Sequence, residues 1–86
     1  MTKDLPQHEI ARQWRERTGW SRAELAQRIG YSVSSISDYE SGRSRSSGNE
    51  IGDNEWLRYR LACAAVAAHV QFDWTSCRIV LDAAQP

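Results

Sequence analysis

The residue types that support nucleophilic, acid–base or metal chemistry are sparse and scattered in this chain of 86 residues. Cys63 and Cys77 form no C-x-x-C pair, and no histidine stands at a ligand spacing from either of them. His8 is a lone histidine in a polar turn, and Asp38 with Glu40 makes a poor acid–base pair. We therefore expect no enzyme activity, no metal site and no cofactor, and we expect two reduced thiols, with Cys63 acting as a small buried hydrophobe.

Arginine is the residue type that suggests a binding function. Ten of the eleven basic side chains are arginine, and eleven acidic side chains bring the net charge to zero. Residues 1–48 carry eight basic and six acidic groups, whereas residues 49–86 carry three and five. Arginine forks fit phosphates and guanine edges, but they also form ordinary surface ion pairs. The mild basic excess in the first half therefore supports nucleic-acid binding only weakly.

Two short helices joined by a tight turn are predicted within residues 20–42. Ser21 and Glu24 have the S-x-x-E spacing of a capping box, which Trp20 before it and Leu25 behind it extend into a hydrophobic staple. Gly30 can adopt the positive φ that ends the first helix, and Ser32 opens the second one. The second helix carries short polar side chains at positions 34, 35, 37, 38 and 41, so another surface can approach it closely. This pattern predicts a helix-turn-helix unit.

The flanking segments complete one small domain. A first helix is predicted after a cap at Asp4, and it ends at Gly19. Residues 42–54 are a loop by composition, and residues 55–70 form the longest helix. The predicted core stripe of that helix is Leu57, Leu61, Ala64, Ala65 and Ala68, with Trp56, Tyr59 and Val66 off the stripe. The apolar surface in excess of this small core suggests a second copy of the chain as a partner.

Residues 72–84 are consistent with two alternatives. Asp73 can cap a short fifth helix from Trp74 to about Leu81, whereas the alternation of residues 75, 77, 79 and 81 suits a strand. We prefer the helix, so that the C-terminal helices cover residues 55–83. The N-terminus has no apolar run of a signal peptide, and no segment has the length of a membrane span, so we expect a cytoplasmic protein.

The run SRAELAQRIGYSVSSISDYESGR, residues 21–43, resembles the signature of the Cro and phage-repressor (lambda-repressor-like) family of DNA-binding domains. The matching features are the LAQRIG run at 25–30, Ser32 at the second cap, Ile36 in the core, and Glu40 followed by Gly42 and Arg43. The resemblance implies an all-α domain of four to five helices over residues 1–86, with the helix-turn-helix unit at about 21–42.

The resemblance also implies a set of DNA-contacting residues. The second helix of the unit becomes the recognition helix, which lies in the major groove. Base contacts are expected from Val33, Ser34, Ser37 and Asp38. Phosphate contacts are expected from Arg22, Ser32, Ser35, Arg43 and Arg45. Arg15 is expected to form a structural ion pair with Glu40, which ties the first helix to the recognition helix.

The reading positions depart from the family pattern, in which glutamine, arginine or lysine is common. Val33 can contact a thymine methyl group, Ser34 can bond several base edges, and Asp38 can accept from a cytosine amino group. We therefore expect modest direct discrimination, with DNA shape and the loop arginines contributing more. The long loop after Gly42 is either an arm that reaches a groove through Arg43 and Arg45 or an inert insertion.

Two functions follow as hypotheses. The first is a sequence-specific transcriptional regulator, a small dimeric (auto)repressor of a phage, plasmid, anti-defence or toxin–antitoxin operon. It would bind a palindromic operator in double-stranded DNA as a homodimer formed through its C-terminal helices. The second is a protein–protein interaction module that keeps the fold without specific DNA binding. The zero net charge and the absence of arginine from the recognition face favour the second hypothesis, whereas Arg22, Arg43 and Arg45 favour the first.

Overall fold

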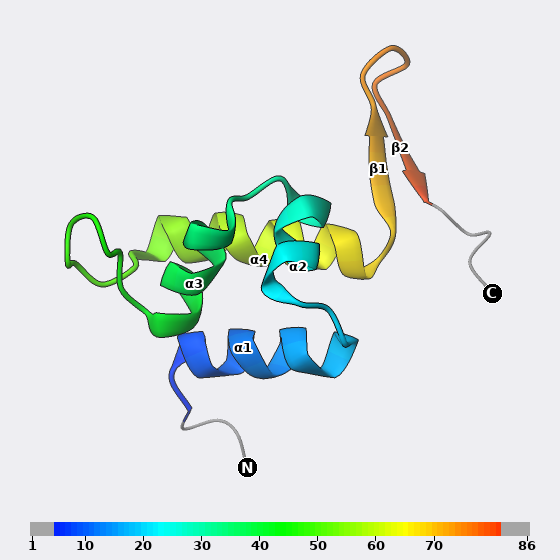
Figure 1. The fold of residues 1–86 in the computed structure, drawn as a ribbon. Coiled ribbons are helices and arrows are strands. Elements are labelled where there is room, and N and C mark those ends of the chain that lie inside the picture. Colours follow the sequence, from blue (N-terminus) through cyan, green and yellow to red (C-terminus); the bar gives the residue numbers. More distant parts are fainter. Residues whose placement is uncertain (1–4, 82–86) are drawn as a thin grey trace.

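A computed structural model describes residues 5–81, which form four helices followed by a β-hairpin (Figure 1). The helices are α1 (Gln7–Thr18), α2 (Arg22–Ile29), α3 (Val33–Ser41) and α4 (Asp53–Ala67), and the strands are β1 (Val70–Asp73) and β2 (Arg78–Leu81). Helix α3 packs against α1 and α2, and α2 also contacts α4. The hairpin projects from the end of α4 and contacts it through β1 (Figure 1).

The helix boundaries of the turn region are confirmed. The Ser21 hydroxyl accepts from the Glu24 amide at 3.1 Å, and the Glu24 carboxylate accepts from the Ser21 amide at 2.7 Å. The Ser32 hydroxyl likewise accepts from the Ser35 amide at 3.0 Å. Gly30 has a φ of 76° at the end of α2, where a side chain would be strained. The predicted cap of α1 at Asp4 lies outside the described residues, and Pro6 occupies the N-cap position of that helix.

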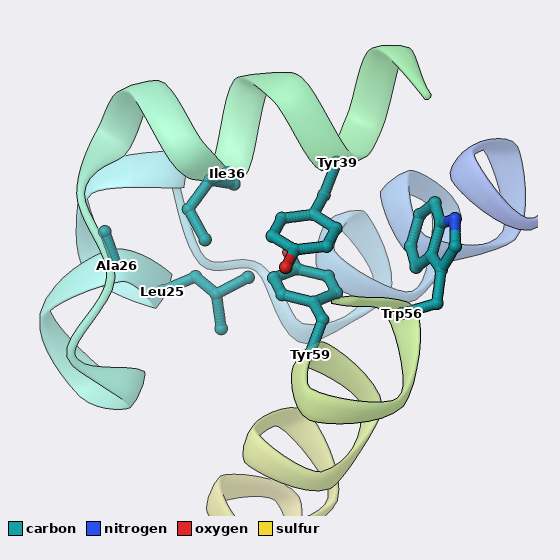
Figure 2. Packing of buried hydrophobic residues seen from close by; sticks show 6 residues of the cluster. All are labelled: Leu25, Ala26, Ile36, Tyr39, Trp56 and Tyr59. Carbon is teal, nitrogen blue, oxygen red and sulfur yellow. The ribbon is translucent and has the colours of Figure 1, made fainter. Parts of the chain in front are cut away.

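The core is built around stacked aromatic rings. The rings of Tyr39 from α3 and Tyr59 from α4 are parallel, with centroids 4.1 Å apart (Figure 2). Trp56 packs edge-on against both rings, and Leu25 and Ile36 are completely buried beside them. Cys63 packs against this cluster as a free thiol, and burial raises its pKa to about 11. The predicted role of Cys63 as a small hydrophobe therefore agrees with its position.

The predicted core face of α4 was wrong. Trp56 and Tyr59, which were placed off the core stripe, are buried, whereas Leu57 and Leu61 are 45% and 61% exposed. Both sets have helical spacing, so the pattern of apolar residues alone does not choose between them. The choice follows from the neighbouring helix, since Tyr39 offers a flat ring on which aromatic side chains can stack with more buried area than leucines. The helix also begins earlier than predicted, because the Glu55 carboxylate accepts from the Gly52 amide at 2.8 Å.

The predicted fifth helix was also wrong, and with it the expectation of an all-α fold. Residues 70–81 form an antiparallel hairpin in which Val70 pairs with Leu81 and Phe72 with Ile79. Asp73 stabilises the turn of the hairpin and not the start of a helix. Its carboxylate accepts from the Thr75 amide and from the Ser76 hydroxyl. β-branched and aromatic residues on both sides of this turn favour strands, and pairing them satisfies backbone groups that a lone strand would leave open.

The hairpin is amphipathic. Directly paired residues share a face of an antiparallel sheet, so Val70, Phe72, Ile79 and Leu81 lie together, and Gln71, Asp73, Arg78 and Val80 lie on the opposite face. Most of the apolar face is exposed, including Ile79 at 70%. The hairpin therefore carries a second exposed apolar surface, separate from the leucines of α4.

The two stacked tyrosines provide a matched test of this core. The Tyr39 hydroxyl donates to the Glu55 carbonyl oxygen at 3.2 Å, whereas the buried Tyr59 hydroxyl has no hydrogen-bond partner among residues 5–81. We expect Tyr39→Phe to lower the free energy of unfolding by about 1 kcal/mol, because a hydrogen bond is lost. Tyr59→Phe should leave it unchanged or raise it, because an unsatisfied buried hydroxyl is removed. Urea denaturation of both variants measures the difference, and equal losses would contradict the assigned hydrogen bonding.

Candidate nucleic-acid interface

The outward face of α3 carries the predicted base-contacting residues. Val33, Ser34, Ser37 and Asp38 follow the i, i+1, i+4, i+5 spacing of one helix face, opposite the buried side chains of Ile36 and Tyr39. Val33 and Ser34 are exposed, and Ser37 and Asp38 are partly buried. Three of the four side chains are polar and all four are short, so this face can approach a flat or grooved surface closely. We call residues 33, 34, 37 and 38 the base-reading face, after the role that the sequence predicts for them.

A buried carboxylate joins three of the helices behind this face. The Arg15 guanidinium from α1 donates to both oxygens of Glu40 in α3, at 2.6 and 3.1 Å, so the predicted ion pair is present. Arg15 also donates to the Trp20 carbonyl oxygen at 2.9 Å, between α1 and α2. The Glu40 side chain is only 2% exposed, and its hydrogen bonds raise the pKa of Arg15 above the usual value.

Arg22 at the start of α2 shares this carboxylate. Its Nε donates to Glu40 Oε1 at 3.0 Å, while its side chain remains 47% exposed. The sequence predicts only a phosphate contact for Arg22, and no fixed sequence spacing indicates its bond to Glu40. The pairing holds a half-exposed guanidinium at the first residue of α2, next to the first amides of that helix.

The loop after α3 folds back onto the base-reading face. Arg45 Nε donates to Asp38 Oδ1 at 3.0 Å, and Arg45 Nη2 donates to the Ser34 carbonyl oxygen at 3.4 Å. Two residues predicted to contact DNA separately are therefore brought together. Asp38 and Arg45 are seven positions apart, but Arg45 lies beyond the end of α3 at Ser41, so the periodicity of the helix does not indicate the contact.

Arg43 occupies a different place, within the loop itself. It forms an isolated bridge with Glu50, and Arg43 Nη1 donates to the Gly48 carbonyl oxygen at 3.0 Å. Backbone bonds from Ser44 to Asn49 and from Ile51 to Gly42 close the loop. Ser32 and Ser35 lie at the start of α3, where the two hydroxyls are 3.0 Å apart. The structure thus gathers Arg15, Arg22 and Glu40 into one cluster and Ser34, Asp38 and Arg45 into another. The Arg43 side chain joins neither, although its backbone amide donates to the Asp38 carbonyl oxygen at 3.2 Å.

The part of the chain that the structure describes contains neither a metal-binding cluster nor a membrane-spanning helix. No three histidine, cysteine, aspartate or glutamate side chains within residues 5–81 are grouped to hold a metal ion. Among the helices described, none is long and apolar enough to cross a membrane.

The comparison with known families agrees with this geometry. A family model described as a helix-turn-helix domain matches residues 10–53, which include most of α1, all of α2 and α3, and the loop after α3. The chain belongs to this helix-turn-helix family, which fits the resemblance to the Cro and phage-repressor type, and in general terms it is a DNA-binding regulator. Searches of curated proteins and of solved structures give no match.

The buried ion pair makes a prediction about stability. Glu40→Gln leaves the nearly buried Arg15 guanidinium without a counter-charge, so we expect the free energy of unfolding to fall by about 3 kcal/mol. Glu16→Gln is the matched control, because Glu16 pairs with Arg12 on the exposed side of α1. Such a surface pair contributes at most about 0.5 kcal/mol. Urea denaturation measures both, and similar small losses would show that the Glu40 carboxylate does not hold the helices together.

Proposed function

We propose that the chain is a sequence-specific transcriptional regulator that places α3 in the major groove of double-stranded DNA. The observation that carries this proposal is the base-reading face, an outward strip of small and polar side chains against which the exposed Arg45 folds back. Phosphate contacts come from Arg22 and Arg43, from Ser32 and Ser35, and from the first two amides of α2, since helix N-termini favour anions.

The contact between Arg45 and Asp38 refines how bases are read. Arg45 Nη1 and Asp38 Oδ2 have no hydrogen-bond partner within residues 5–81, so they remain available. A guanidinium held by a carboxylate is oriented, and it can donate to O6 and N7 of guanine. In this proposal Arg45 reads a base, supplying the long side chain that α3 lacks, and Asp38 positions it. The alternative is the phosphate contact that we first assigned to Arg45.

These two roles for Arg45 predict different binding data. If Arg45 reads guanine, Arg45→Ala should reduce affinity about tenfold or more for the preferred sequence and should lose discrimination at one G·C pair. Arg43→Ala, the matched loop control, should weaken binding to all sequences alike and lower the salt dependence. Fluorescence anisotropy against a panel of single-base variants separates the two outcomes. Uniform weakening by Arg45→Ala would return that residue to the phosphate backbone.

The regulatory role is a small dimeric (auto)repressor of a phage, plasmid, anti-defence or toxin–antitoxin operon, acting in the cytoplasm. A two-fold axis would set two copies of α3 about 34 Å apart, one turn of DNA, on a palindromic operator. Occupying a promoter in this way blocks transcription without an effector domain.

The operator hypothesis is tested by a gel shift against the DNA upstream of the coding sequence, with a salt titration. Specific binding should weaken as salt rises, because each phosphate contact releases counterions. Arg22→Ala should weaken binding to every sequence, whereas Ser34→Ala should change which sequence is preferred. Binding that is indifferent both to sequence and to salt would rule out the operator.

One set of observations favours a second candidate, a protein-interaction module that keeps the fold without specific DNA binding. Arg22, Arg43 and Arg45 are all engaged with carboxylates of the same chain. The net charge of the chain is zero, so no overall field attracts DNA. If the chain is such a module, the gel shift should give no specific complex at any salt concentration, although the protein is folded and stable.

A further inference from the structure

The outward side of α4 carries an apolar stripe that the fold of one chain leaves uncovered. Leu57 and Leu61 are 45% and 61% exposed, and Ala64 and the C-cap residue Ala68 are exposed as well. The steps of four, three and four residues keep these side chains on one line along the helix, away from the buried Trp56 and Tyr59. The stripe (Leu57, Leu61, Ala64 and Ala68) thus has the spacing of a helix–helix seam without a partner in the described chain.

We propose that a second copy of the chain covers this stripe, with the two α4 helices antiparallel across a two-fold axis level with Ala62 and Cys63. This inference gives the dimer of the proposed function a specific interface. It rests on the shape and charge of α4, and it does not depend on DNA binding.

The stripe is complementary to itself in this one register. The two-fold axis places Leu57 of one copy opposite Ala68 of the other, and Leu61 opposite Ala64. Each layer then pairs one large side chain with one small side chain, the arrangement that lets two helices interdigitate. The same contacts occur twice, as a closed two-fold dimer requires.

Charge selects the antiparallel orientation. Arg58 and Arg60 flank the stripe on its two sides, and both are exposed. In a parallel pair opposite sides of the stripe face each other, so Arg58 of one copy would lie beside Arg60 of the other copy, and like charges would repel. In the antiparallel pair Arg58 lies level with Ala67 of the second copy, and Arg60 lies level with Ala65. The alanine-rich end of α4 therefore receives the charged end of its partner without a like-charge contact.

The size of the stripe sets the strength of the association. A stable interface buries about 800 Å² on each partner, more than a strip one helix wide and four residues long provides. The dimer is therefore weak and concentration-dependent in free solution. Two adjacent half-sites on DNA would raise the effective concentration of the second copy and favour the pair.

Sedimentation of the full chain without DNA tests the interface. The wild-type protein should change from monomer to dimer as its concentration rises, and Leu61→Glu should weaken the dimer at least about tenfold. Ile79→Glu is the matched control, because it places the same charge on the exposed apolar face of the hairpin. It should leave the dimer unchanged. A wild-type monomer at all concentrations, or a dimer lost only with Ile79→Glu, would overturn the proposal.

A mixing experiment tests the register. Leu61→Glu and Ala64→Lys should each dimerise poorly alone, because each brings like charges near the axis. Mixed together they should form a heterodimer, detected by native mass spectrometry, since the introduced glutamate of one chain lies opposite the introduced lysine of the other. A parallel pair would relieve the same like-charge repulsions in the heterodimer, so the register is decided by the double variant Leu61→Glu/Ala64→Lys. In the antiparallel pair each introduced glutamate lies opposite an introduced lysine, so this variant alone should dimerise more tightly than either single variant. Weaker dimerisation of the double variant than of both single variants would overturn the antiparallel register.

Failure of the proposed interface can be distinguished from failure of the proposed function. If no operator is found but the heterodimer forms, the interface stands and the regulator hypothesis fails. If the protein binds its operator and Leu61→Glu, with an unchanged melting temperature, binds two half-sites as tightly as the wild type, the interface fails and the regulator hypothesis stands.

Discussion

The buried carboxylate of Glu40 is the interaction on which the arrangement of the first three helices depends. Among residues 5–81 it is the one charged residue that is buried, so it requires partners in fixed positions. Arg15 from α1 binds both of its oxygens, and Arg22 from α2 binds one of them. Because Glu40 belongs to α3, these bonds set the position of α3 relative to the two helices before it. They also compensate the negative charge of the buried carboxylate.

The aromatic stack is the second constraint, and it determines what α4 exposes. Tyr39 and Tyr59 lie face to face, which commits one side of α4 to the core (Figure 2). The leucines at positions 57 and 61 then point outward, although their spacing suits a core equally well. The stacking of Tyr59 on Tyr39 thus both anchors α4 in the core and exposes the surface on which we propose that a second copy binds. The hairpin adds a separate apolar face at the end of α4.

The base-reading face depends on a loop as much as on a helix. Val33, Ser34 and Ser37 are short, and Asp38 is held by Arg45 from beyond the turn. A carboxylate that orients a guanidinium converts two single contacts into one directional donor, which suits guanine better than either residue alone. This link between loop and helix connects the long segment at 42–54 with the proposed specificity, and it favours the arm over the inert insertion.

The sequence by itself determined the features that are local. The capping box at Ser21, the cap at Ser32 and the glycine at position 30 specify two helices and their turn, because each bond spans only a few residues. The resemblance to the family added the pair of Arg15 and Glu40, 25 positions apart, which no local rule indicates. Only the tertiary structure decided which face of α4 is buried, since two stripes satisfied the same periodicity. It also decided that residues 70–81 form a hairpin, and that Arg22 and Arg45 meet carboxylates of α3. These outcomes depend on neighbours that are distant in the chain, and periodicity carries no information about such neighbours.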